Sequence, residues 1–161
     1  MKLVYLFFLL ALFSSCGSQK STPPANEYPI QPVPFTRVEV TDDFWAPRIA
    51  TNHRVTIPIA LQKSRETGRI DNFKIAGGLM EGEFKSIYPF DDSDVFKIIE
   101  GAAYSIQMFP DPALEAAIDT LVTLIGLAQE EDGYLYTNRT IMGERSHPWA
   151  GSKRWELVDD L

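Results

Sequence analysis

The sequence predicts an all-α fold whose basic unit is a pair of antiparallel helices. Apolar residues recur at helical spacing over two neighbouring stretches, 95–109 and 114–128. The first apolar face comprises Val95, Ile98, Ile99, Ala102, Ile106 and Phe109, widened by Phe96 and Ala103; the second comprises Leu114, Ala117, Ile118, Leu121, Ile125 and Ala128. Pro110-Asp111-Pro112 separates them, with Asp111 as N-cap and Pro112 in the first turn. So short a connection makes an antiparallel helix hairpin, the repeating unit of helical toroids and solenoids.

The segment before this hairpin predicts a short strand and then a broken helix. Residues 35–40 alternate apolar and polar side chains, which favours a strand. Thr41-Asp42-Asp43 supplies capping oxygens for a helix over 45–67. Pro58 breaks that helix near residue 57, and Gly68 ends it.

The remaining segments read as connections and caps. Residues 69–90 have no sustained periodicity, which predicts a long loop. We expect the aspartates of 91–94 to cap the helix that follows. Beyond the hairpin, 131–133 forms a turn, 134–137 is extended, and 155–161 begins another helix.

The N-terminus predicts an export signal and a tether rather than part of the fold. Lys2 precedes an apolar run, 3–13, that is too short to span a bilayer as a helix. Residues 13–17 resemble a bacterial lipobox, which makes Cys16 the expected lipid attachment site; the alternative is an ordinary signal peptide. We therefore expect a signal peptide over 1–15, a Pro-rich lipoprotein tether over 16–34 and a folded region over 35–161. This predicts a lipid-anchored protein on the periplasmic side or the surface of a Gram-negative envelope.

The composition excludes several classes of function. There are 15 Lys and Arg against 22 Asp and Glu, a formal net charge of −7, which disfavours nucleic acid and anionic lipid surfaces as partners. One cysteine and two histidines are too few for a Cys-rich zinc site. We therefore expect no metal ligands and no cofactor in this chain. His53 and His147 are expected to have structural or surface roles, and the glycines of 77–82 do not form a phosphate-binding motif.

The strongest candidate for chemistry is the segment 88–94, which joins Tyr88 and Phe90 to three aspartates. Aromatic faces beside carboxylates suit a sugar, because its C–H faces stack on rings and its hydroxyls donate to carboxylates. The alternative is that the acids only cap a helix and the rings only pack. Glu130, Glu131 and Asp132 are expected to form a solvated turn.

Five blocks of sequence, in order, resemble one known family. They are 40–49 (VTDDFWAPRI), 68–74 (GRIDNFK), 90–97 (FDDSDVFK), 100–104 (EGAAY) and 132–135 (DGYL). Together they are similar to the N-terminal part of glycoside hydrolase family 127, the β-L-arabinofuranosidases, and their close relatives.

This resemblance implies an (α/α)6 toroid, incomplete in this chain, and release of terminal β-L-arabinofuranosyl units from plant glycans with retention. It also implies a cysteine nucleophile held in a zinc site with further cysteines and a glutamate, and a second glutamate as acid/base. None of these matches a residue here, so we expect no catalytic residue in this chain, with zinc implied for the full-length enzyme only. The family's Phe-x-Asp-Ser-Asp segment maps onto Phe90, Asp92, Ser93 and Asp94 as sugar-binding candidates, with Asn72 as a further candidate.

The sequence therefore predicts a piece of a secreted glycosidase that is inactive alone and has a carbohydrate as its partner. Two alternatives remain open at this stage. One is a non-catalytic glycan-binding lipoprotein, and the other is a helical interaction module.

Overall fold

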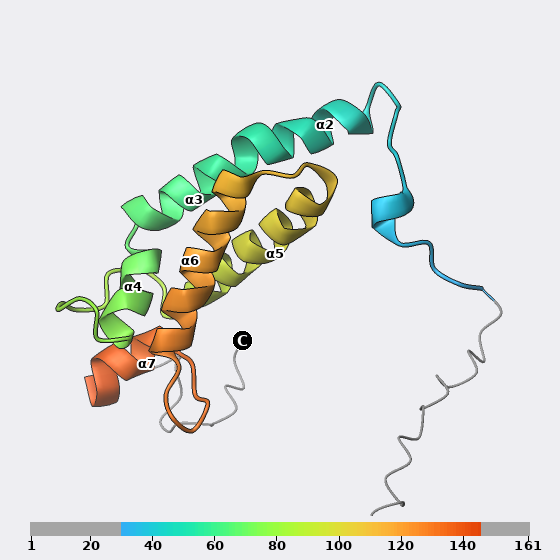
Figure 1. Cartoon of the computed structure of the whole chain (residues 1–161). Coiled ribbons are helices and arrows are strands. Elements are labelled where there is room, and N and C mark those ends of the chain that lie inside the picture. Colours follow the sequence, from blue (N-terminus) through green and yellow to red (C-terminus); the bar gives the residue numbers. More distant parts are fainter. Residues whose placement is uncertain (1–29, 146–161) are drawn as a thin grey trace, which may run out of the picture. The chain divides into compact units, whose positions relative to one another are not determined.

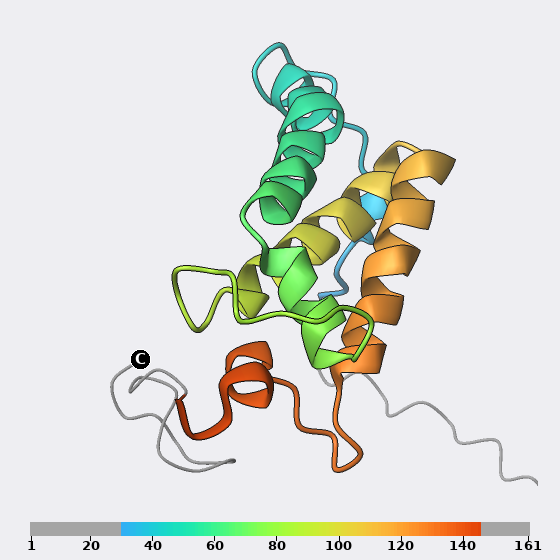
Figure 2. The same cartoon turned by 90° about the vertical axis from the view of Figure 1, so that its left-hand side faces the viewer.

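The computed structural model describes residues 30–145, and all the regular secondary structure in that range is helical (Figures 1 and 2). In chain order the elements are η1 (Phe35–Arg37), α2 (Trp45–Thr51), η2 (Asn52–Thr56), α3 (Ile57–Glu66), α4 (Arg69–Ala76), α5 (Asp92–Met108), α6 (Pro112–Ala128), α7 (Thr137–Met142) and η3 (Gly143–Arg145). The chain divides into two units between residues 35 and 36. Of the first unit, only residues 30–35 are described, and all six are exposed. No described helix is both long and apolar enough to cross a membrane.

The predicted strand at 35–40 is wrong. Residues Phe35–Arg37 form a single 3₁₀ turn, and residues 38–41 have no regular secondary structure. A strand gains its stability from hydrogen bonds and side-chain pairs with a neighbouring strand, and no strand is present in residues 30–145. The alternating pattern of 35–40 is therefore not sufficient by itself to form a strand.

The predicted broken helix is present, with the break in an unexpected form. Asp42 Oδ1 accepts hydrogen bonds from the backbone N–H groups of Phe44, at 2.7 Å, and Trp45, as predicted for a capping aspartate. The chain then stays helical from Trp45 to Glu66, as the nearly continuous rod of α2 and α3 in Figure 1 shows. The π-helical turn η2, in which the Ile57 N–H reaches the Asn52 carbonyl, ends two residues before Pro58. Since proline lacks an N–H and crowds the preceding turn, this widened turn accommodates it without ending the helix.

The long loop predicted for 69–90 is also wrong in its first part. Gly68, with φ +81°, ends α3, and a new helix, α4, starts at once. α4 has only eight residues and buries Ile70 and Phe73 at 4% and 1% exposure. Two apolar contacts over two turns are too few to give a clear periodic signal. The irregular connection therefore covers 77–91 only.

The helix hairpin α5–α6 forms as predicted and carries most of the core. Asp111 caps α6, its Oδ1 accepting from the N–H groups of Ala113 and Leu114 at 3.0 Å each. The buried core residues are Ile57, Leu61, Ile70, Phe73, Val95, Ala102, Leu114, Ile118, Leu121 and Ala128. The predicted widening of the α5 face is only partly present. Ala103 is exposed, whereas Phe96 is 39% exposed but its ring centroid lies 5.8 Å from that of the buried core residue Phe73.

The segment after α6 turns back and adds one more short helix. Asp132 Oδ1 accepts from the Tyr134 N–H at 3.1 Å, and residues 134–136 are irregular, with Tyr136 extended. Thr137, predicted to be extended, instead begins α7. The predicted signal peptide, Cys16 and the helix expected at 155–161 lie outside the described residues. So does most of the predicted tether, of which residues 30–34 have no regular secondary structure.

Candidate functional site

Arg69, the first residue of α4, contacts three polar side chains: Thr67 at the end of α3, and Asp91 and Asp94 at the start of α5. Its Nε donates to Asp94 Oδ2 at 3.0 Å, and its Nη1 donates to Thr67 Oγ1 at 2.7 Å. Its Nη2 lies 3.1 Å from Asp91 Oδ2, as an ion pair without the alignment of a hydrogen bond. One guanidinium therefore fixes the acidic segment against α4.

The acidic residues do not cap α5 as predicted. Asp91 occupies the N-cap position, but its side chain accepts no hydrogen bond from the first turn of the helix. The carboxylate is instead almost fully buried against Arg69. Burial raises the pKa of Asp91 above its ordinary value, and the Arg69 charge opposes that rise. The capping interpretation fails because a guanidinium offers this buried carboxylate a charged partner.

Asp92 has a different partner, 45 residues away in the sequence. Its Oδ2 accepts from the Thr137 N–H at 2.7 Å, and its Oδ1 accepts from the Thr137 hydroxyl at 2.5 Å. Both residues are buried, at 6% and 0% exposure. Burial raises the pKa of Asp92, while the two hydrogen bonds from Thr137 act in the opposite direction. Asp92 thus supplies the first N–H of α7 with an acceptor.

Asn72, on α4, fixes the loop that leads to the acidic segment. Its Oδ1 accepts from the Lys85 N–H at 2.9 Å, and its Nδ2 donates to Ser86 Oγ at 2.5 Å. Asp71, its neighbour, accepts from Lys85 Nζ at 2.8 Å. The loop around 85–86 is therefore held on both its backbone and its side chains.

Two aromatic rings are left partly exposed beside these contacts. Tyr88 and Phe90 stack with ring centroids 5.5 Å apart and an angle of 15° between the ring planes. They are 48% and 40% exposed, respectively. Stacked rings that are partly exposed can take the C–H face of a sugar.

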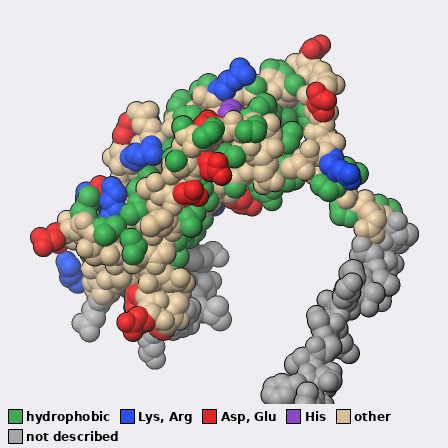
Figure 3. All heavy atoms as spheres, viewed as in Figure 1, with side chains coloured by type: hydrophobic (Ala, Val, Ile, Leu, Met, Phe, Trp, Pro, Cys, Tyr) green, Lys and Arg blue, Asp and Glu red, His purple; other side chains and the backbone are tan. Residues whose placement is uncertain are grey.

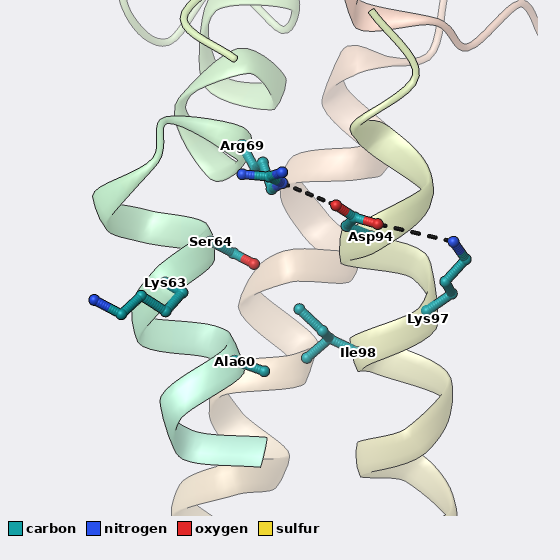
Figure 4. Close-up of a pocket in the computed structure, with 7 residues that line it drawn as sticks. All are labelled: Ala60, Lys63, Ser64, Arg69, Asp94, Lys97 and Ile98. Atoms are coloured by element: carbon teal, nitrogen blue, oxygen red, sulfur yellow. Dashed lines mark hydrogen bonds and ion pairs between the residues drawn. The ribbon is translucent and has the colours of Figure 1, made fainter. Parts of the chain in front are cut away.

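Asp94 also faces a pocket of about 400 Å³ between α3 and α5 (Figure 4). The lining residues are Ala60, Lys63, Ser64, Arg69, Asp94, Lys97 and Ile98. Lys97 Nζ lies 3.8 Å from Asp94 Oδ1, on the side away from Arg69. Over one whole face of the molecule, charges of both signs are interspersed with apolar side chains (Figure 3).

The structure therefore groups four of the five predicted sugar-binding residues in one turn, where the Ser93 N–H also donates to the Phe90 carbonyl, and the fifth reaches that turn indirectly. Phe90, Asp92 and Asp94 are near neighbours in sequence, whereas Asn72 acts through the loop at 85–86. The sequence reasoning missed Arg69, although it lies inside a block that resembles the family. It also missed Thr137 and Ser64, for which no local pattern gave a signal.

Other predicted candidates have structural contacts. His53 Nδ1 lies 2.9 Å from Ser105 Oγ, and the imidazole stacks on Phe109 at 5.1 Å, which agrees with its expected structural role. Glu130 accepts from the Thr140 hydroxyl at 2.8 Å. Among residues 30–145, no group of three or more His, Cys, Asp or Glu could hold a metal ion, so the residues present do not fit the zinc that the resemblance implies.

Comparison with known proteins identifies the family. The model of the family "Beta-L-arabinofuranosidase, GH127 catalytic domain" matches residues 37–157. The chain belongs to this family. A curated GH127 relative, the non-reducing end β-L-arabinofuranosidase of Bifidobacterium longum subsp. longum, is 43% identical over 89 residues.

Solved structures of GH127 enzymes have the same helical arrangement. One, described as a GH127 β-arabinofuranosidase, has 48% identity and a TM-score of 0.75 over 83% of this chain. Another, a GH127 β-L-arabinofuranosidase from Geobacillus stearothermophilus, has 34% identity and a TM-score of 0.63 over 71% of this chain. The chain spans 13% of the curated relative's length, and 21% and 19% of the two solved chains.

Proposed function

We propose that this GH127 chain forms the N-terminal helices of an (α/α)6 glycosidase domain and contributes to the pocket for a terminal β-L-arabinofuranosyl unit of plant glycans. The observation that carries the proposal is the exposed Tyr88–Phe90 stack next to the fixed acidic turn, within a segment that matches the family model. The rings offer an apolar platform, and the adjoining carboxylate offers a hydrogen-bond acceptor.

Four of the five predicted sugar-binding residues divide into two roles in this proposal. Phe90 and Asp94 contact the sugar directly, because the ring and the carboxylate are both partly exposed. Asp92 and Asn72 act as positioning residues, since Thr137 occupies both oxygens of Asp92 and the 85–86 loop occupies Asn72. The first pair recognises the ligand, and the second pair keeps the turn in place.

We further propose that this chain does not cleave the glycosidic bond by itself. The resemblance implies a cysteine nucleophile supported by further cysteines, and this chain has a single cysteine, Cys16, at the predicted lipid attachment site. A zinc-bound thiolate is the chemistry that the full-length enzyme would use. No step of that chemistry is assigned to residues 30–145.

The proposed location is the cell envelope, with the chain exported and anchored through a lipid on Cys16. The support is the apolar run at 3–13, the lipobox-like residues before Cys16 and the proline-rich segment that follows. Metabolic labelling with a fatty acid analogue tests it. Wild-type chain should be labelled and fractionate with membranes, whereas Cys16→Ser should not be labelled.

Sugar contact is tested by amide NMR titration of the whole chain with L-arabinose and with β-linked arabino-oligosaccharides. We expect shifts at 88–94, and we expect Phe90→Ala to weaken binding about fivefold, the loss of about 1 kcal/mol of ring contact. Phe44→Ala is the matched control, because Phe44 is also exposed and also contacts a neighbouring ring, Trp45. An unshifted 88–94 segment at saturating oligosaccharide would overturn the sugar contact.

Hydrolysis is tested separately with an aryl β-L-arabinofuranoside. We expect the purified chain to release the aryl group no faster than buffer alone. Release above that rate by purified chain would contradict the proposed lack of activity while leaving the sugar contact standing.

A second candidate, a glycan-binding lipoprotein with no catalytic role, is favoured by the same exposed stack. The titration and the hydrolysis assay would give the same result for it. The two are separated by supplying the remaining catalytic domain of a GH127 relative in trans, where restored hydrolysis supports the enzyme role and its absence supports the binding role.

A further inference from the structure

The helix α6 carries few charges on any side, although only one side of it is covered. α5 and α6 each have 17 residues, but α5 has four charged side chains and α6 has two, Glu115 and Asp119. α6 packs chiefly against α4 and α5, and Figure 2 shows it at the edge of the helical unit with α5 on one side. A helix that is largely apolar all round is typical of a position with neighbours on both sides.

A continuous stripe of exposed residues runs along the uncovered side of α6. Its members recur at intervals of three and four residues, so they share one face over the length of the helix. They are Ala113, Ala116, Thr120, Thr123 and Leu127, and all five are exposed. Leu127 is the largest of them and is 50% exposed. This set is called the α6 stripe below.

The two threonines of the α6 stripe present methyl groups rather than hydroxyls. Thr120 Oγ1 donates to the Ala116 carbonyl at 2.8 Å, and Thr123 Oγ1 donates to the Asp119 carbonyl at 2.9 Å. Because each hydroxyl is turned back onto its own helix, the stripe needs no polar partner. Its small side chains also allow the axis of another helix to come close, since the distance between packed helices depends on the side chains at the contact.

Two acidic residues flank the α6 stripe and indicate the charge of its partner. Glu115 and Asp119 lie four residues apart, on the same edge of the stripe, and both are exposed. The sequence of α6 contains no basic residue, so a second copy of α6 would offer these carboxylates no cation. In an antiparallel pair, it would also place one Asp119 beside the other near the middle of the helix. The charges therefore argue against self-association through this face.

We propose that the α6 stripe is the docking surface for a further helix of the full-length GH127 polypeptide. That helix has small apolar side chains against the stripe and a Lys or Arg opposite Glu115 or Asp119. The inference rests on the proposed function, which places this chain in a larger helical domain. Its occupant is supported by the comparisons, because the chain shares the fold of a solved GH127 enzyme at a TM-score of 0.75 but spans 21% of its length.

A chimera tests the proposal. In it, residues 37–157 of this chain replace the corresponding segment of the 48% identical GH127 enzyme. Each substitution is made in the chimera and in the isolated whole chain, and the thermal midpoint of unfolding is measured. Thr123→Glu changes a side chain that is exposed in the isolated chain and should move its midpoint by less than about 3 °C. In the chimera it buries an unpaired carboxylate and should lower the midpoint by at least about 5 °C.

Two further substitutions test the chemistry of the partner. Ala116→Leu should leave the isolated chain nearly unchanged but lower the midpoint of the chimera, because a larger side chain keeps a closely packed helix away. Asp119→Lys should lower the midpoint of the chimera more than Asp119→Asn does, since it sets two cations against each other. Gln107→Glu is the matched control, because it adds the same carboxylate to an exposed position on α5 and should change neither midpoint.

Four results would overturn the proposal. The first is a chimera that does not fold, because α6 would then not fit the proposed neighbour. The second is an equal effect of Thr123→Glu in the chimera and in the isolated chain. The third is an Asp119→Lys chimera at least as stable as the Asp119→Asn chimera. The fourth is dimerisation of the isolated whole chain in sedimentation equilibrium that Leu127→Glu abolishes, which would make a second copy the occupant.

Phe90→Ala in the chimera separates this proposal from the proposed function. The sugar contact predicts that Phe90→Ala raises KM for an aryl β-L-arabinofuranoside, whereas the docking surface predicts a lower midpoint for Thr123→Glu. If KM is unchanged but Thr123→Glu destabilises the chimera alone, the docking surface stands and the sugar contact fails. The reverse pattern rejects the docking surface alone.

Discussion

The carboxylate of Asp92 holds both the backbone N–H and the hydroxyl of Thr137, at 2.7 Å and 2.5 Å. This contact joins the first residue of α5 to the first residue of α7. Because both partners are buried, each satisfies polar groups that have no access to water. The position of the proposed sugar-binding turn therefore depends on a residue after the helix hairpin.

Replacing Asp92 with Ala should destabilise the chain by about 2–4 kcal/mol, because it leaves the N–H and hydroxyl of Thr137 buried without an acceptor. Thr137→Val, which removes only the hydroxyl, should cost less, about 1–2 kcal/mol. Asp94→Ala is the control. Because the Asp94 carboxylate is 43% exposed, this substitution should lower the unfolding free energy by less than about 1 kcal/mol. Urea unfolding measures all three, and equal losses for Asp92→Ala and Asp94→Ala would show that burial of the contact does not matter.

Asp92 and Asp71 should shape the pH dependence of stability in opposite ways. Burial raises the pKa of Asp92 above 3.8, so the folded state binds the proton more tightly than the unfolded state. Its contribution to stability is therefore greatest below 3.8 and declines as pH rises to the raised pKa. Lys85 first, and then Lys74, lower the pKa of Asp71 below 3.8, so its contribution is present above 3.8 and is lost as pH falls through the lowered pKa.

The variants Asp92→Asn and Asp71→Asn isolate these two contributions, because neither amide ionises. The loss of unfolding free energy that Asp92→Asn causes, relative to wild type, should become smaller as pH rises above 3.8. The loss that Asp71→Asn causes should become smaller as pH falls below 3.8. Urea unfolding across acidic and neutral pH measures both differences. If the two differences changed with pH in the same direction, the opposite roles of Asp92 and Asp71 would be contradicted.

Gly68 and Gly78 offer a matched pair for backbone strain. Both have positive φ, +81° and +72°, where a side chain costs about 1–2 kcal/mol. A Cβ on Gly68 would also lie 2.5 Å from the Cβ of Lys85, whereas one on Gly78 would meet nothing within 4 Å. Gly68→Ala should therefore lower the thermal midpoint clearly more than Gly78→Ala. Equal midpoints for the two variants would mean that the Lys85 loop moves aside freely.

The sequence predicted the parts of the fold that repeat and missed those that depend on distant partners. The α5–α6 hairpin was predictable because both helices carry long apolar faces and Asp111 gives a clear N-cap. α4 was missed because Ile70 and Phe73 alone do not establish a period. The 3₁₀ turn at 35–37 replaced a strand because alternation does not supply a pairing partner.

The candidate site shows the same limit. The acidic turn and its aromatic neighbours were evident as a group, but the roles of Asp91 and Asp92 were not. Their partners, Arg69 and Thr137, lie far from them in sequence, so the spacing of residues around Asp91 and Asp92 does not predict either contact. Only the packing of α4 against α5, and of α7 against α4, brings them together (Figure 2).

Arg69→Gln gives the most direct test of how the site is held together. The substitution removes the positive charge beside Asp91, whose side chain is only 3% exposed, and beside Asp94. A buried carboxylate left without its partner typically costs about 3–5 kcal/mol, and the partial exposure of Arg69 reduces this to about 2–4 kcal/mol. Urea unfolding at neutral pH should show this loss.

The double variant Arg69→Gln/Asp91→Asn should regain at least about half of that loss, because the amide carries no charge that needs a cation. Asp94→Asn in the same background should regain little, since Asp94 is 43% exposed and water solvates it. Equal rescue by the two aspartate substitutions would place the cost of losing Arg69 in hydrogen bonding to Thr67 or in packing. Selective rescue by Asp91→Asn would identify the buried charge as the reason why α4 and α5 need this arginine.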